Sequence, residues 1–204
     1  MAAPTSRLAQ FVKWMGPALP SLLGTIVMLV LGYWVKDSVD IALKRQQMQL
    51  SFAKEMQAQL DTMSKPESDI STAERAAVLL STFGEPAITP LLNEMRYGGN
   101  RSIAAEAGLR ALALTDADGL CRVLPNVLTS RSQQFGWETH LRVIRLLGAA
   151  NCVNTKPVLV AYQRSIRDAR EGKSKEYFEL IADSPKDDQL NQVSGALERT
   201  IKIL

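Results

Sequence analysis

The chain has 204 residues, of which 24 are basic and 21 acidic, for a net charge of +3. It holds one histidine and two cysteines, so it excludes a metal cluster or a catalytic dyad built from histidines. It also lacks a CxxC motif and a glycine-rich phosphate loop. From these absences we expect no metal and no cofactor.

The first feature along the chain is an uncharged run, Trp14–Val35, between Lys13 and Lys36. As a helix this run would cover roughly 30 Å, the thickness of the hydrocarbon core of a bilayer. Aromatic side chains at its two ends suit the headgroup level. Residues 1–36 are therefore predicted to be a tail and a single transmembrane helix. A buried core helix and a cleaved signal peptide are the alternatives, but no A-x-A cleavage motif follows Val35.

The flanking charges predict the orientation of this span. Two basic residues precede it, Arg7 and Lys13, and four follow it, Lys36, Lys44, Arg45 and Lys54. Because basic residues accumulate on the cytoplasmic side, we expect a single-pass protein of the cell membrane with its C-terminal part in the cytoplasm. A periplasm-facing domain on the same anchor is the alternative.

The two cysteines bear on the same choice. Cys121 and Cys152 lie in segments that otherwise resemble packed helices, where small buried thiols are inert. We expect both to be free thiols. The periplasm-facing alternative instead predicts a disulfide between them, because that compartment is oxidising.

A helical stalk is predicted over residues 37–64, which are rich in good helix formers. Pro66 ends it, and residues 65–70 form a hinge. One face of the stalk carries an apolar stripe with an eleven-residue repeat. We predict oligomerisation, as in a coiled coil, through the stripe residues Met48, Phe52, Met56 and Leu60. Alternatively the stripe docks on the following domain or lies along the membrane surface.

Short bursts of apolar residues at helical spacing follow the hinge, with no alternating strand pattern. A first helix capped by Ser71 and a second led by Pro86 are expected. Further helices are predicted over residues 103–114, 120–128 with a kink at Pro125, 137–147, 157–170, 177–181 and 190–203. The fold class is therefore all-α.

The helices also repeat in pairs. Residues 77–84 align with 107–114, 30 positions further on, and with 141–148, another 34 positions on, and such periods are typical of an α-solenoid. The stretch AAVLLSTFGEPAITPLLNEMRYGGNRSIAAEAGLRAL resembles a HEAT repeat, and the resemblance extends over Ser71–Arg170. It implies a curved scaffold whose second helices line a concave binding face, without catalytic chemistry. We expect a HEAT-like domain over residues 71–183 and a capping helix over 184–204.

No catalytic centre is predicted. His140 is expected to be a partly buried structural side chain, and a Cys–His nucleophile has no motif context. Acidic pairs at two helix N-termini, Asp116 with Asp118 and Asp187 with Asp188, are expected to stabilise the helix dipoles.

The charge distribution supplies the binding hypothesis. Between residues 131 and 175 there are nine basic and three acidic residues, a balance of +6, whereas residues 67–130 and 176–204 are each at −3. We predict that an acidic protein partner docks on Arg122, Asn126, Arg164 and Arg167. A solvated surface is the alternative, and nucleic acid is not favoured because no aromatic residues are interleaved with the basic ones.

The sequence thus predicts a membrane-anchored helical-repeat scaffold that holds a protein partner at the membrane. Its expected partners are the lipid bilayer, an acidic protein and a second copy of the chain. Besides the periplasm-facing alternative, an enzyme with an unrecognised site is a further alternative.

Overall fold

The computed structural model describes residues 19–65 and 67–204, with side chains in the first helix given at Met28, Lys36 and from Val39 onward. Helices and the loops between them make up these ranges, which contain no strand. The predicted all-α class is confirmed. The predicted span, Trp14–Val35, lies outside the described side chains apart from Met28. Among the described residues, no helix is both long enough and apolar enough to cross a membrane.

The contacts divide the chain into two units, residues 1–53 and Lys54–Leu204. Helix α2, Leu19–Ser64, provides the described part of the first unit and the beginning of the second. Its length agrees with its composition, because no glycine or proline occurs between Gly32 and Ser64.

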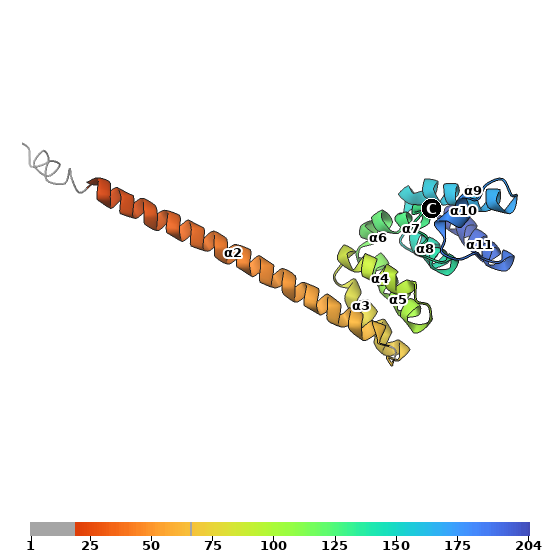
Figure 1. Ribbon diagram of the computed structural model, residues 1–204, viewed down its shortest axis with the longest axis horizontal. Coiled ribbons are helices and arrows are strands. Elements are labelled where there is room, and N and C mark those ends of the chain that lie inside the picture. Colours follow the sequence, from red (N-terminus) through yellow and green to blue (C-terminus); the bar gives the residue numbers. More distant parts are fainter. Residues whose placement is uncertain (1–18, 66) are drawn as a thin grey trace, which may run out of the picture. The chain divides into compact units, whose positions relative to one another are not determined.

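The second unit is a succession of short helices (Figure 1). After the end of α2 these are α3 (Ile70–Ser81), η1 (Glu85–Ala87), α4 (Ile88–Met95), α5 (Gly99–Thr115), α6 (Ala117–Val123), α7 (Pro125–Thr129), α8 (Trp137–Ala149), η2 (Val153–Thr155), α9 (Lys156–Arg170), α10 (Glu176–Leu180) and α11 (Asp187–Ile203).

Four helices of this unit pack on one another in chain order: α3 on α5, α5 on α8, and α8 on α11. The intervening helices also contact one another, α4 with α6 and α7 with α9. One core runs through the unit, and its fully buried side chains include Leu80, Leu109, Ile144 and Leu197, one from each of α3, α5, α8 and α11. Burying such side chains is the main source of stability of the unit.

Small residues bring α3 and α5 close together. Ala73, Ala77, Ala104 and Gly108 are all buried. A Cβ atom at Gly108 would lie 2.6 Å from the backbone oxygen of Ala77. Only glycine fits there without a shift of one helix against the other.

Several helix ends differ from the prediction. Asp69, not Ser71, caps α3, because its side chain accepts a hydrogen bond of 2.8 Å from the Thr72 amide. Hydrogen bonds from the Thr72 hydroxyl and from its amide together lower the pKa of the Asp69 carboxyl. Pro125 separates two helices, α6 and α7, where a single kinked helix was expected.

The cap of α8 comes from a distant part of the chain. Gly136 precedes this helix and has no side chain to offer. The Asp183 carboxylate instead accepts a hydrogen bond of 2.8 Å from the Trp137 amide. Beside it, the Ala182 amide donates to the Phe135 carbonyl oxygen at 2.9 Å. The loop before α11 thereby closes on the start of α8.

The apolar stripe of the predicted stalk is divided between the two units. Met56 and Leu60 pack against the core of the second unit, and Met63 is buried in it. Met48 and Phe52, in the first unit, have 62% and 40% of their surface exposed. The end of α2 therefore belongs to the folded domain. This agrees with the alternative in which the stripe docks on the domain that follows it.

The expectation of free thiols is wrong. Cys121, on α6, and Cys152, in the turn after α8, form a disulfide with their Cα atoms 5.3 Å apart. The fold brings these residues together although 31 positions separate them in sequence, and no cysteine in the described ranges is left unbonded. The bond ties the second pair of helices to the beginning of α9.

Candidate functional site

The candidate site is built on helix α9. Pro157 occupies its first turn, where the missing amide hydrogen costs nothing. Leu159, Tyr162 and Ile166 recur at helical spacing and are buried against the core. The opposite side of the helix is exposed; we call it the α9 face and define it by Pro157, Val160, Ala161, Arg164 and Arg167.

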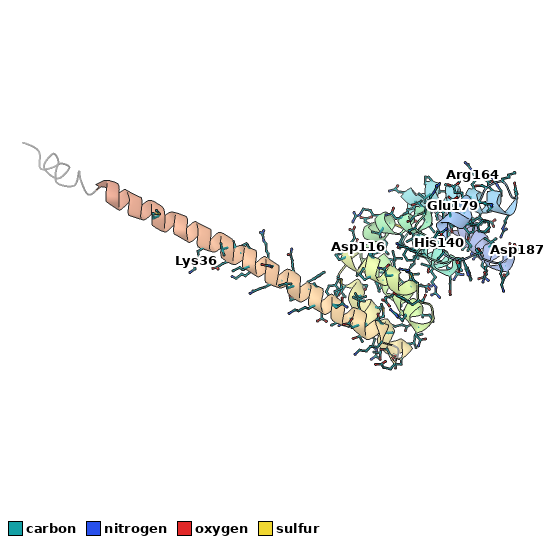
Figure 2. The ribbon with its side chains drawn as sticks, viewed as in Figure 1. Lys36, Asp116, His140, Arg164, Glu179 and Asp187 are labelled. Carbon is teal, nitrogen blue, oxygen red and sulfur yellow. A yellow bond between two sulfur atoms is a disulfide. The ribbon has the colours of Figure 1, made fainter. Side chains whose placement is uncertain are left out.

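Three depressions in the surface border Arg164, which Figure 2 labels on α9. A groove of about 380 Å³ runs between α9 and α11 and is also lined by Arg167, Arg170 and Glu198. A second groove, of about 590 Å³, lies between α7, α9 and α10.

The third depression, of about 720 Å³, is a broad and shallow hollow beside the start of α9. We call it the Lys156–Arg164 hollow. It is lined by Val153, Asn154, Lys156, Pro157, Val160, Ala161 and Arg164. No acidic side chain is in that set, whereas both grooves contain at least one.

Much of the predicted basic block is neutralised within the chain. Arg142 pairs with Glu106 on α5 and, at 2.9 Å, with Glu138 on its own helix. Arg131 lies 3.6 Å from both Glu176 and Glu179. These arginines are therefore poor candidates for binding an acidic partner.

The four predicted binding residues do not form one cluster. Arg164 and Arg167 line the α9–α11 groove together, as their spacing predicts. Arg122 is engaged in an ion pair with Glu85, and neither Arg122 nor Asn126 lines a depression that Arg164 borders. Arg167 lies 3.7 Å from the neighbouring Asp168, whereas Arg164 has no ion-pair partner among the described residues.

Lys156 is a site residue that the sequence prediction did not include. Within the described ranges it too has no ion-pair partner. Lys156, Val160 and Arg164 are spaced four apart and therefore follow one another on the helix surface. This spacing could have indicated Lys156 as a site residue from the sequence, but only if the start of α9 at Lys156 had been known.

His140 lies away from this surface, inside the domain (Figure 2). Its Nδ1 atom shares a hydrogen bond of 2.6 Å with the Tyr162 hydroxyl, and the Tyr162 and Tyr177 rings meet edge to face at 5.6 Å. Burial lowers the pKa of His140 to about 4 and raises that of Tyr177 to about 12. The cluster joins α8, α9 and α10, and its histidine is neutral at pH 7.

A Cys–His nucleophile is not formed, because both cysteines are in the disulfide and His140 is bonded to Tyr162. The acidic pairs occupy helix starts as expected: Asp116 caps α6 through the Gly119 amide at 3.0 Å, and Asp187 and Asp188 lie in the first turn of α11. In the described part of the chain, no group of three or more histidine, cysteine or acidic side chains is placed to bind a metal ion.

Comparison of the chain with profiles of known protein families, with curated proteins and with solved structures finds no match.

Proposed function

We propose that this protein is a membrane-anchored helical scaffold that binds a protein partner through the α9 face, without catalysis. The observation on which the proposal rests is that face itself. It is exposed and borders three depressions, and neither Arg164 on this face nor the half-buried Lys156 beside it has an acidic partner in the described residues. Unneutralised cations beside exposed apolar side chains are suited to binding another protein rather than to a reaction.

The packing order supports a HEAT-like solenoid as the architecture. Helices α3, α5, α8 and α11 stack in sequence, and the second helices that follow α3, α5 and α8 contact one another beside them. A stack of this kind exposes its second helices along one side, which is the side that such repeats use for binding. Helix α9 is the second helix of the third pair.

The apolar run Trp14–Val35 supports the anchor. For the orientation, the Cys121–Cys152 disulfide favours the alternative to the cytoplasmic placement. Structural disulfides persist in oxidising compartments, whereas flanking basic residues are a weaker guide when the counts are four and two. We propose that the domain faces an oxidising compartment, such as a periplasm.

Site-specific photo-crosslinking in intact membranes tests this function. A photoreactive residue at Val160 is expected to capture a defined protein, and purification through that protein should recover this chain in return. The matched control places the same residue at Leu114 on α5, which has 88% of its surface exposed and lines none of the three depressions. Equal capture at both positions, or none at Val160, would contradict the proposal.

A further inference from the structure

We infer that the Lys156–Arg164 hollow binds an extended peptide segment of the partner in which two carboxylates flank one apolar side chain. The inference rests on the proposed function and specifies the chemistry of the partner. It follows from the charge, the floor and the length of the hollow.

The charge of the hollow is uniformly positive. Lys156 and Arg164 line it without an acidic neighbour in the same set, and neither is in an ion pair with another described residue. The α9–α11 groove is less suited to an anion because Glu198 lines it. An acidic ligand is therefore expected on the Lys156 side of Arg164.

The floor of the hollow is apolar. Pro157, Val160 and Ala161 are exposed there, and Val153 at its end has 51% of its surface exposed. Phosphate or a free carboxylate would leave this surface uncovered. A side chain such as leucine, seated between the two cations, would cover it.

The length of the hollow sets the spacing of the ligand. Lys156 and Arg164 are eight positions apart on one helix, which corresponds to about 12 Å along its axis. In an extended peptide, residues i and i+4 are about 13 Å apart, and i, i+2 and i+4 lie on the same side. The expected pattern is therefore acidic–x–apolar–x–acidic.

Fluorescence anisotropy with the purified full chain tests the inference. The probe is a short fluorescein-labelled peptide with the order Glu-Ser-Leu-Ser-Glu between glycines. We expect saturable binding that weakens as salt is added. Replacing both glutamates with glutamine, or the leucine with serine, should each weaken it, because each change removes one of the two kinds of contact.

Two double variants of the protein complete the test. Lys156→Glu with Arg164→Glu should weaken binding of the probe by about tenfold or more, since two attractive charges become repulsive. Arg145→Glu with Lys202→Glu makes the same change in net charge at exposed positions outside the hollow, and should alter binding less than about twofold.

Each other outcome would overturn the inference. Equal losses in the two double variants would mean a general charge effect, and absence of saturable binding would mean that the hollow does not accept this ligand. Binding to vesicles of anionic phosphatidylglycerol that is lost in the Lys156→Glu with Arg164→Glu variant, without binding of the peptide, would assign the hollow to lipid. If crosslinking from Val160 still identified a partner in these cases, the scaffold function would stand while this choice of ligand would fail.

Discussion

At the scale of single residues, His140 is the side chain whose environment has the clearest thermodynamic consequence. It is fully buried, and its Nε2 atom has no hydrogen-bond partner among the described residues. A charged imidazolium there would lose its hydration without a compensating carboxylate. The ring is therefore held neutral by its surroundings, and protonation must compete with folding.

We predict that the domain loses stability on acidification because of His140. Its pKa is about 4 in the folded state and 6.5 when unperturbed, so between these values the unfolded chain binds a proton that the folded chain does not. Stability attributable to this residue is complete above pH 6.5 and falls by about 3 kcal/mol towards pH 4. Urea unfolding from pH 7 to pH 4 measures it.

The control is His140→Gln, which keeps a hydrogen-bonding group near Tyr162 but does not titrate. The quantity compared is the difference in pH dependence between the two proteins, so a lower stability of the variant at pH 7 does not affect the test. Identical pH profiles would show that His140 is accessible to protons in the folded state.

Other residues show why part of the site could not be predicted from sequence. The exposed positions of Arg164 and Arg167 follow from helical spacing alone. Arg122 and Arg142, by contrast, pair with Glu85 and Glu106, more than thirty positions away. Which arginines remain without an acidic partner depends on how the helices stack, and local patterns contain no information on that.

At the scale of helices, apolar periodicity and helix-breaking residues predicted most of the helices. The residues at which the helices begin and end, by contrast, depend on contacts that form only in the fold. Asp183 caps α8 from 46 positions along the chain, so no local motif could identify it. The disulfide was missed for the same reason, because two cysteines in helical segments do not reveal whether their Cα atoms will meet.

Gly108 provides a test of how α3 and α5 pack. Gly108→Ala is predicted to lower the free energy of unfolding by about 1–3 kcal/mol, because the added methyl group would press on the Ala77 backbone oxygen. The control is Gly195→Ala in α11, where the nearest atom is the end of the flexible Arg199 side chain at 3.7 Å. That variant should gain up to about 1 kcal/mol from helix propensity.

Chemical denaturation of both variants gives the comparison directly. The same substitution in two helix interiors is expected to have opposite signs. A gain at Gly108 equal to that at Gly195 would mean that the two helices do not approach as closely as described.

The division of the stripe on α2 leads to a second prediction at this scale. Met56→Asp with Leu60→Asp should destabilise the domain by at least about 2 kcal/mol, since both side chains pack against its core. Met48→Asp should leave the domain within about 0.5 kcal/mol of the original, because this side chain has 62% of its surface exposed, and should weaken oligomers if the stripe forms them. Thermal unfolding and analytical ultracentrifugation in detergent separate the two effects. An unchanged domain stability in the first pair would contradict the docking of the end of α2.

At the scale of the whole molecule, the proposed function depends on which compartment the domain occupies. The Cys121–Cys152 disulfide bears both on the compartment and on the stability of the domain. It closes a loop of 31 positions between the second and third helix pairs, and the loss of chain entropy in the unfolded state makes such a loop worth about 3–4 kcal/mol. That is a large share of the stability of an ordinary domain.

We therefore predict that the protein in native membranes, with thiols trapped by alkylation before extraction, migrates faster on a non-reducing gel than after reduction. Cys121→Ser with Cys152→Ser should abolish the shift and lower the free energy of unfolding by about 3–4 kcal/mol. Adding reductant to the original protein should lower its stability by a similar amount and leave the variant unchanged. Free thiols in membranes would contradict the oxidising location. A bonded pair whose removal cost nothing would mean that the helix stack alone holds α6 against the start of α9.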